Sequence, residues 1–203
     1  MSLLPIFMKE FEIGDVTVKI EQEGQVGIGG MVWDASLILA KFIYWNRKDI
    51  FLNSRTVLEV GSGTGICGLA CALMEPKLNV TLSDLYSHLA LIQTNIDIND
   101  TKNVNCCEID WFKPEGAGKF DLIIGSDVVY EPDLFEPLLD TLEVVTHKDS
   151  VILLCNELRM TRDLNFYKMA QKKGWTLTIL PEHLQDKEYF SHECPIMRFT
   201  RNR

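Results

Sequence analysis

The chain has 203 residues, of which 46% are hydrophobic and 24% are charged, and it carries 20 Lys and Arg against 29 Asp and Glu. This balance is typical of one globular domain. The formal charge of −9 argues against a protein that holds nucleic acid by its phosphates, because such proteins cluster Lys and Arg. No run of 18 apolar residues occurs and the N-terminus has no basic start, so we expect neither a membrane span nor a signal peptide.

Cysteine usage indicates a reduced protein. None of the six cysteines forms a C-x-x-C pair or has a histidine at zinc-ligand spacing beside it: Cys67, Cys71, Cys106, Cys107, Cys155 and Cys194. We therefore expect no metal site. Cys67 and Cys71 lie four residues apart in an apolar run, which predicts packing in the core. Reduced cysteines favour the cytoplasm, with the nucleus as the alternative compartment.

Residues 1–50 are expected to form an N-terminal extension packed on a core of residues 51–203, the two making one globular unit. The pattern of residues 11–28 predicts a short strand pair. The segment Ser36–Trp45 is apolar almost all round, with Lys41 as the exception. A helix of that kind is buried on more than one side, so we expect it to pack over a sheet.

Five apolar, β-branched runs alternate with helical patterns in the next hundred residues. The runs are Thr56–Val60, Val80–Ser83, Val104–Ile109, Phe120–Gly125 and Ser150–Cys155. Apolar residues at helical spacing follow the second and the fourth run, at Leu85, Leu89, Ile92 and Ile96 and at Leu134, Leu138, Leu142 and Val145. Strands and helices in alternation predict a parallel sheet that is buried on both faces.

The end of the chain breaks this alternation. After a helix expected near Leu164–Lys173, the strand-like runs Trp175–Leu180 and Ile196–Arg201 are joined by a polar loop with no helical pattern. Two strands joined in this way pair antiparallel. The predicted fold class is therefore α/β: a doubly wound seven-stranded sheet, mostly parallel, with an antiparallel C-terminal hairpin at one edge and helices on both faces.

The sharpest local signal is the segment EVGSGTG at residues 59–65, which follows the first parallel strand and opens a helix. Its glycines permit a tight turn and a close approach of the backbone to a ligand. Asp84 comes nineteen residues after Gly65, at the end of the next strand, where a carboxylate can accept both hydroxyls of a ribose. A glycine turn that only packs a helix on a strand is the alternative, but the turn and the carboxylate together indicate a nucleotide-like ligand.

This ligand is expected to lack phosphate. In the dinucleotide fingerprint G-x-G-x-x-G the third glycine comes one residue later than Gly65 does here. Glu59 precedes the turn, and a carboxylate at that place disfavours a pyrophosphate and suits a cation. S-adenosylmethionine has a ribose, a sulfonium and an ammonium and no phosphate. We therefore predict it as the cofactor, with S-adenosylhomocysteine as the product.

Four further elements accompany the glycine loop. They are Val32-Trp33-Asp34, Leu82-Ser83-Asp84, Asp110-Trp111 and Asp127-Val128-Val129-Tyr130. In this order they resemble the seven-β-strand (class I) S-adenosylmethionine-dependent methyltransferases, which are Rossmann-like, and among these the non-histone protein lysine methyltransferases of the methyltransferase-like 21 type. The resemblance runs from about Gly27 to Arg201. The loop is common to many methyltransferases, whereas the Val-Trp-Asp, Asp-Trp and Asp-x-x-Tyr elements in this order are much more specific.

The resemblance implies a cofactor site and an amine site. The residues implied to bind the cofactor are Trp33, Glu59, Gly61, Ser62, Gly63, Asp84, Trp111 and Ser126. Among them the flat indole of Trp111 is expected to stack on or shield the adenine, and Ser126 stands where the family more often has alanine. Asp127 and Tyr130 are the implied catalytic residues, a carboxylate and a phenol that bracket an amine beside the sulfonium methyl. Asp127 would capture and orient the amine, with the proton lost to water before transfer.

Simpler roles stay open for several of these residues. Trp33 could be a core tryptophan, and Asp34 could merely cap the buried helix. Asp127 could cap the helix whose first turn Pro132 suits. Asn95, in the helix after Asp84, is expected to point to solvent.

Two valines, at positions 128 and 129, help to choose the substrate. Methyltransferases that act on the exocyclic amine of adenine have prolines there, which stiffen the turn around a planar amine. This departure and the acidic charge favour a lysine ε-amine of a non-histone protein, of the chaperone, translation factor or AAA ATPase class. The alternatives are a small-molecule methyltransferase and a non-catalytic scaffold with this fold.

The expected partner is a protein that presents a lysine, without nucleic acid or membrane, and the enzyme is expected to be a monomer. Glu157 and Arg159 follow the fifth strand. They either line the substrate entrance or form a surface ion pair.

Overall fold

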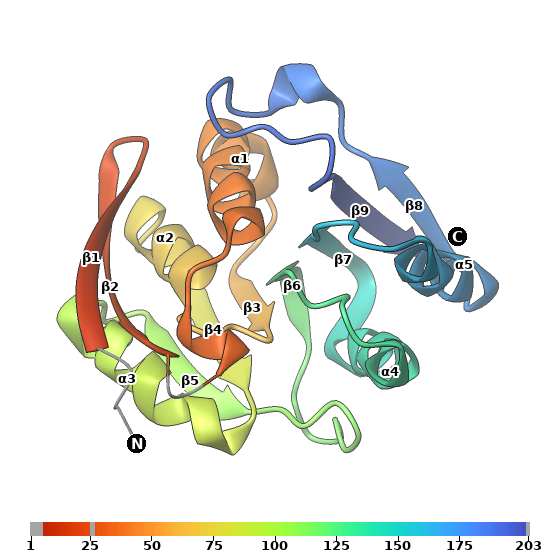
Figure 1. Ribbon diagram of the computed structural model, residues 1–203, viewed down its shortest axis with the longest axis horizontal. Coiled ribbons are helices and arrows are strands. Elements are labelled where there is room, and N and C mark those ends of the chain that lie inside the picture. Colours follow the sequence, from red (N-terminus) through yellow and green to blue (C-terminus); the bar gives the residue numbers. More distant parts are fainter. Residues whose placement is uncertain (1–5, 25–26, 202–203) are drawn as a thin grey trace.

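One sheet of seven strands organises the molecule, in the order β5-β4-β3-β6-β7-β9-β8 (Figure 1). The strands are β3 (Thr56–Val60), β4 (Asn79–Asp84), β5 (Val104–Glu108), β6 (Phe120–Ser126), β7 (Thr146–Cys155), β8 (Trp175–Ile179) and β9 (Ile196–Arg201). The strands from β5 to β7 pair parallel, whereas β9 pairs antiparallel with both β7 and β8. This computed structural model describes residues 6–24 and 27–201, apart from the side chain of Arg162. It confirms the predicted fold class and the antiparallel hairpin at the sheet edge.

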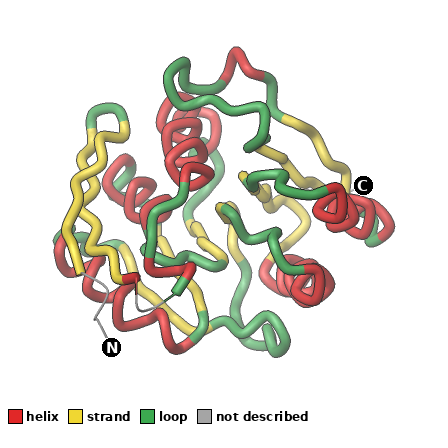
Figure 2. Tube along the Cα trace, viewed as in Figure 1, coloured by secondary structure: helices red, strands yellow, loops and turns green. Residues whose placement is uncertain are grey.

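Helices cover both faces of the sheet (Figure 2). One face carries α1 (Asp34–Ile50), α2 (Ile66–Met74) and α3 (Leu89–Ile98), and the other carries α4 (Phe135–Val145) and α5 (Leu164–Lys172). Successive strand residues point to opposite faces, so Val57 of β3 joins the core under α1 to α3 and Leu58 joins the core under α4 and α5. Cys67 and Cys71 of α2 are fully buried in the first core, as predicted.

Strand β7 begins four residues before the apolar run that predicted it. The added segment from Thr146 is mostly polar and carries exposed residues, which explains why no apolar signal marks it. Phe120 pairs with Thr146 and Leu122 pairs with Val151, so the register shifts between them. The hydroxyl of Ser150 donates a hydrogen bond to the Phe120 carbonyl at 2.6 Å, which holds the shifted segment in place.

Helix α1 packs over the sheet and is buried on more than one side, as its apolar composition predicts. It contacts α2, β6, β7 and β1, and the indole Nε1 of Trp45 also donates to Asp186 in the loop before β9 at 2.7 Å. The helix begins at Asp34, whose side chain makes no capping hydrogen bond. In residues 6–24 and 27–201, no helix has both the length and the apolar character that a membrane crossing requires.

An N-terminal hairpin of β1 (Ile6–Ile13) and β2 (Val16–Glu23) lies beside α2 and α3. A strand pair was predicted, but over residues 11–28, of which Gln25 and Val26 lie outside the described residues and Ile28–Gly30 form a short 3-10 helix. Six of the eight residues of β1 are exposed and only Phe11 and Ile13 are buried, so no alternation marks the first five residues of this strand.

Asn95 anchors this hairpin, which corrects the prediction that its side chain points to solvent. Asn95 is fully buried. Its Oδ1 accepts the Glu21 N–H at 2.7 Å, and its Nδ2 donates to the carbonyls of Glu21 at 3.1 Å and Thr64 at 3.0 Å. Because Thr64 belongs to the glycine loop, one amide ties β2 to the turn after β3. The buried side-chain amide of Asn95 is stable there because its oxygen and its nitrogen both have hydrogen-bond partners.

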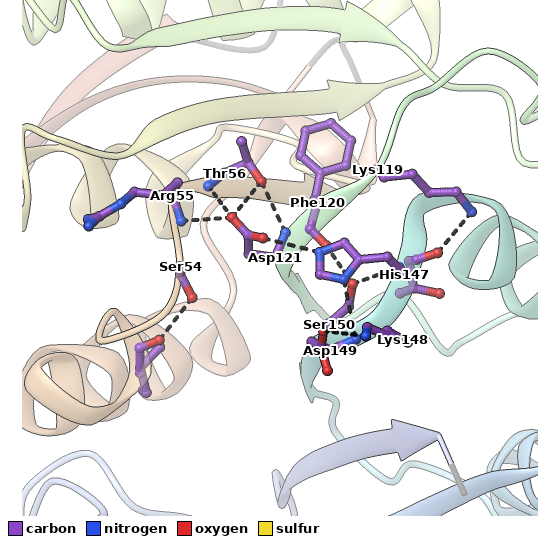
Figure 3. Close-up of polar contacts among 12 residues, drawn as sticks. Ser54, Arg55, Thr56, Lys119, Phe120, Asp121, His147, Lys148, Asp149 and Ser150 are labelled. Atoms are coloured by element: carbon purple, nitrogen blue, oxygen red, sulfur yellow. Dashed lines mark hydrogen bonds and ion pairs between the residues drawn. The ribbon is translucent and has the colours of Figure 1, made fainter. Parts of the chain in front are cut away.

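A polar cluster fixes the amino-terminal end of the parallel strands (Figure 3). Oδ2 of Asp121 accepts the backbone N–H groups of Arg55 and Thr56 at 2.8 and 2.9 Å and the Thr56 hydroxyl at 2.9 Å. Its Oδ1 lies 3.1 Å from Nε2 of His147 on β7. Partial burial raises the pKa of Asp121, but these hydrogen bonds outweigh it and lower the pKa overall. One carboxylate thus joins the starts of β3, β6 and β7.

We expect Asp121→Ala to lower the free energy of unfolding by about 1–3 kcal/mol at pH 7, because two backbone N–H groups lose a charged acceptor. The pKa of Asp121 is lower in the folded chain than in the unfolded one. Its contribution is therefore complete above about pH 4 and is lost as the pH falls below that value. Urea unfolding at pH 7 and pH 3 measures this, with the exposed Asp149→Ala as the matched control. An equal difference between variant and wild type at both pH values would contradict the assignment.

Candidate active site

A cavity of about 460 Å³ opens at the carboxyl ends of the parallel strands. Its walls come from the segments that follow β3, β4, β5 and β6, from the turn before α1 and from one residue after β7. Strand order reverses between β3 and β6, and ligands of open α/β sheets bind at such a switch point. The volume lies within the range of about 300–1,000 Å³ that is typical of small-molecule sites.

The glycine loop forms the floor of this cavity. Gly63 has φ of 54°, and a Cβ there would lie 2.7 Å from the Gly29 carbonyl, so only glycine lets the two segments meet. Ser62 fixes the loop to the neighbouring strand: its N–H donates to the Ser83 carbonyl at 2.9 Å, and its hydroxyl accepts the Ser83 N–H at 2.9 Å. Gly61, Ser62 and Gly63 all line the cavity, as the predicted cofactor site requires.

Glu59 lies behind the loop and not in the cavity wall, which corrects the prediction that its carboxylate faces a cationic ligand. Its side chain is 1% exposed and Oε2 accepts the Gly68 N–H of α2 at 2.9 Å. Burial raises the pKa of Glu59 to about 8, against the hydrogen bond from Gly68, which lowers it. At neutral pH the side chain therefore holds a proton and links the loop to α2 as a neutral group.

A proton held by Glu59 makes the stability of the protein depend on pH. The folded chain keeps this proton up to about pH 8, whereas the unfolded chain releases it near 4.5, so the free energy of unfolding contributed by Glu59 falls as the pH rises between these values. We expect Glu59→Gln to gain stability relative to wild type from pH 5 to pH 8, without a change in ligand affinity. Thermal unfolding across this pH range checks the prediction, and parallel curves for the two proteins would contradict it.

Asp84 is held in a fixed orientation at the end of β4. Its Oδ2 accepts the Gly63 N–H at 2.8 Å, and its Oδ1 accepts the Leu85 N–H at 2.8 Å and lies 3.2 Å from Nδ1 of His88. Each carboxylate oxygen can accept about two hydrogen bonds, so Oδ2 retains a free acceptor position toward the cavity. Sequence reasoning missed His88, although its spacing of four residues from Asp84 was a usable signal. Leu85 was predicted to lie on one face of a helix, but it precedes α3 and lines the cavity.

Two tryptophans form walls of the cavity. Trp111 follows β5 and packs beside the loop, since a Cβ on Gly61 would lie 3.2 Å from its Cζ2. Trp33 precedes α1, is 42% exposed and donates its Nε1–H to the Ile28 carbonyl at 2.9 Å. It is therefore not a core tryptophan. Asp110 stabilises the turn at Trp111 by accepting the Phe112 N–H at 2.9 Å.

Asp127 follows β6 in a conformation that is uncommon for a residue other than glycine, with φ of 56°. The backbone around it is clamped: its N–H donates to the Cys155 carbonyl at 2.8 Å, and the N–H groups of Val128 and Val129 both donate to Oδ1 of Asn156. Asp127 does not cap a helix, because the helical turn of Pro132 begins after Glu131. Backbone strain held in this way is typical of functional sites.

Ser126 and Tyr130 flank this carboxylate in the same cavity. Ser126 ends β6 and lies 3.9 Å from the Cys67 thiol. Tyr130 is 38% exposed at the rim, and partial burial, together with nearby Asp84, Glu131 and Asp127, raises the pKa of its phenol. Its hydroxyl therefore keeps its proton at neutral pH.

Arg159 was considered from the sequence only as part of the entrance or of a surface ion pair, and Asn156 was not considered at all. Arg159 forms two hydrogen bonds with Asp127 and one ion pair with Glu157, and it also lines the cavity. It therefore has both of the roles that the sequence left open. Asn156 is fully buried after β7. Its position next to an apolar strand was the only available signal, since its partners lie 27 and 28 residues earlier.

The chemistry of the cavity wall suits a cation without phosphate. Three carboxylates line the cavity, from Asp84, Asp110 and Asp127, and the basic residues in the described wall, His88 and Arg159, each pair with one of them. An acceptor for ribose hydroxyls, a flat indole and a glycine floor accompany them. Among the described residues, no group of His, Cys, Asp and Glu could hold a metal ion.

Comparison with known proteins identifies the family. A family model described as "Lysine methyltransferase" matches residues 13–173. The chain belongs to this lysine methyltransferase family. It is 33% identical over 171 residues to Protein N-lysine methyltransferase METTL21A of Mus musculus, covering 80% of this chain and 77% of the relative. It is also 30% identical over 186 residues to Protein-lysine N-methyltransferase EFM6 of Saccharomyces cerevisiae, covering 78% and 76%.

Solved structures agree on the fold of this methyltransferase. The T. thermophilus 16S rRNA N2 G1207 methyltransferase (RsmC), in complex with AdoMet and guanosine, has a TM-score of 0.72 and covers 98% of this chain and 51% of its own, at 16% identity. At that identity the likeness concerns the fold alone. The activity follows from the family model and the relatives. The protein is an S-adenosylmethionine-dependent protein-lysine methyltransferase.

Proposed function

We propose that this methyltransferase modifies a lysine ε-amine of a non-histone protein that docks over the cavity, with the cofactor lying between Asp84 and Asp127. The observation that carries the proposal is that both carboxylates line one cavity. They end β4 and follow β6, which β3 separates. Two strand spacings place them about 10 Å apart, so a cofactor bound by its ribose at Asp84 would reach the amine at Asp127.

The cofactor is proposed to contact seven residues that line the cavity. They are Trp33, Gly61, Ser62, Gly63, Asp84, Trp111 and Ser126. Asp84 would accept the ribose hydroxyls, Trp111 would shield the adenine, and the glycine floor would admit the backbone close to the ligand. Glu59 supports this floor from behind and is not proposed as a contact.

Asp127 and Tyr130 are proposed to orient the amine. The bound cofactor supplies an electrophilic methyl group on a sulfonium. Transfer then depends mainly on holding the amine nitrogen about 3–3.5 Å from that carbon and in line with the sulfur. A lysine with a pKa near 10.4 is mostly ammonium at pH 7, and freeing its lone pair costs about 4.6 kcal/mol. Asp127 accepts an N–H of the amine, Tyr130 shapes the entrance, and the proton leaves to water.

The rim of the cavity favours a protein as the methyl acceptor. Leu85, Phe112 and Tyr130 are large, exposed side chains of its wall, between 38% and 65% exposed. Exposed apolar surface around a site is typical of a place where a macromolecule docks. One family relative, from Mus musculus, is named EEF1A lysine methyltransferase 3; it is 32% identical over 139 residues, 66% of this chain and 58% of its own. We propose a substrate of the translation factor, chaperone or AAA ATPase class.

The enzyme is proposed to act as a monomer in the cytoplasm or the nucleus, without nucleic acid, membrane or metal. Its six cysteines are all free thiols, which supports a reducing compartment.

Incubation of the purified enzyme with methyl-labelled S-adenosylmethionine and a size-fractionated cell extract tests the proposal. We expect label in the protein fraction and in at least one discrete band. Label only in the small-molecule fraction would support a metabolite methyltransferase instead. Tight cofactor binding without any label would support a scaffold.

A further inference from the structure

The carboxylate of Asp127 is already paired. Arg159 grips it with two parallel hydrogen bonds, Nη1 to Oδ1 at 3.1 Å and Nη2 to Oδ2 at 2.6 Å. The Asp127 side chain is only 9% exposed, against 36% for Arg159. Nη2 also lies 2.7 Å from Oε2 of Glu157, and the guanidinium lies 6.0 Å from the ring centre of Trp33. A two-point contact of this kind fixes the orientation of both groups.

This pairing limits what else Asp127 can bind. Oδ1 accepts a second hydrogen bond, from the Glu157 N–H at 3.3 Å, and each carboxylate oxygen accepts about two. One acceptor position therefore remains, on Oδ2. A neutral amine has two N–H groups and keeps its lone pair for the methyl carbon, whereas an ammonium has three N–H groups to satisfy. A single acceptor position therefore leaves fewer N–H groups of a neutral amine without a partner. The geometry of Asp127 thus suits a neutral amine.

The positive charge of Arg159 acts in the same direction. An unpaired carboxylate in contact with an amine would stabilise its ammonium form and raise its pKa, and a cation in contact with that carboxylate offsets the effect. The titratable groups around the pair are Asp34, Asp84, Tyr130, Glu131, Cys155, Glu157, Tyr167 and Cys194. Burial raises the pKa values of the two tyrosines and two cysteines, so these are neutral at pH 7. The rest are acids, which favour an ammonium, and Arg159 is the cation that contacts Asp127 and opposes this effect.

We propose that Arg159 is a positioning residue that acts through Asp127, leaving it one acceptor position and offsetting its charge so that the substrate lysine is held as a neutral amine. The inference rests on the proposed function and adds how the amine is kept deprotonated. The lysine ammonium loses its proton to water. The nitrogen lone pair then forms the N–C bond as the C–S bond breaks and its electron pair stays on sulfur, so the positive charge moves to the methylated nitrogen.

The pH dependence of kcat tests this role. The protein that the enzyme labels in cell extract is purified and used at saturation, with saturating S-adenosylmethionine, from pH 6 to pH 10. We expect Arg159→Gln to move the acid limb of kcat upward by about one pH unit, which lowers kcat about tenfold at pH 7 and leaves it near wild type at pH 10. Arg159→Lys should restore part of the shift. Glu157→Gln removes an anion beside Arg159 and should move the limb the opposite way.

Two measurements separate this role from a merely structural one. Arg47→Gln removes the same charge at a guanidinium that contacts Tyr44 in α1, and its profile should match wild type. Calorimetry in two buffers at pH 8, with the enzyme loaded with S-adenosylhomocysteine, should show that wild type releases more protons on binding the substrate protein than Arg159→Gln does.

A loss of kcat in Arg159→Gln that is the same at every pH, or no loss at all, would overturn the inference while wild-type labelling of protein lysine leaves the proposed function standing. Absence of protein labelling by both wild type and Arg47→Gln would overturn the proposed function and the inference with it.

Discussion

Asp127→Asn is expected to lower kcat for lysine methylation by about 100-fold or more, while the affinity for S-adenosylmethionine stays within about twofold. The loss follows because the amine is no longer held by a charged acceptor, and one such preorganised contact is worth about 10²–10³ in rate. Asparagine is the informative replacement, since it tolerates the left-handed backbone that Asp127 adopts with φ of 56°. Alanine would add backbone strain to the chemical effect.

Single-turnover kinetics with the labelled substrate protein measure this loss, and calorimetry measures the cofactor affinity. Asp149→Asn, an exposed carboxylate at the start of β7, is the matched control and should keep wild-type rates. If Asp127→Asn turned over within threefold of wild type, Asp127 would have no direct part in transfer.

Asp84→Ala is expected to raise the Kd for S-adenosylmethionine by about 10–100-fold. Hydrogen bonds to a charged acceptor contribute about 1.5–3 kcal/mol, and each 1.4 kcal/mol is a factor of ten in Kd. The variant also removes the acceptor of the Gly63 and Leu85 N–H groups, so the loop loses its fixed orientation. Asp84→Asn keeps one acceptor for these groups, so its Kd for S-adenosylmethionine should lie between those of Asp84→Ala and wild type.

Calorimetric titration with S-adenosylmethionine and with S-adenosylhomocysteine gives both values of Kd. Asp97→Ala, an exposed carboxylate of α3, controls for the lost charge. At saturating cofactor Asp84→Ala should recover most of its kcat, because the amine contacts are intact. An unchanged Kd would place the ribose elsewhere.

The sheet was predictable because its signals are local. Buried parallel strands such as β3 are continuous apolar runs, and the helices between them repeat apolar residues every three or four positions. The sequence did not predict strand segments whose side chains are exposed, because these segments lack an apolar pattern. Residues 6–10 of β1 and Lys148 and Asp149 near the start of β7 are exposed, so no alternation of buried and exposed residues marks these segments.

The site residues that could be predicted from the sequence are those that lie at or directly after the carboxyl ends of the parallel strands. Asp84 was assigned from its place at the end of the strand after the glycine loop, and Asp127 from the resemblance of the Asp-Val-Val-Tyr element to the family. Contacts between residues distant in sequence were not predictable: Asn95, which was misassigned, binds β2 74 residues earlier, and Arg159 binds Asp127 32 residues earlier. Glu59 was predicted to contact the ligand because it lies directly before the glycine loop. Its side chain instead turns inward and accepts the Gly68 N–H.

The most direct test of the account is tandem mass spectrometry of the labelled substrate protein, with wild type and Asp127→Asn compared under identical conditions. The account predicts that wild type adds methyl groups to the ε-amine of one or a few lysines and that Asp127→Asn leaves the same lysines almost unmodified. Methyl groups on another residue type, or equal methylation of lysine by both proteins, would contradict it.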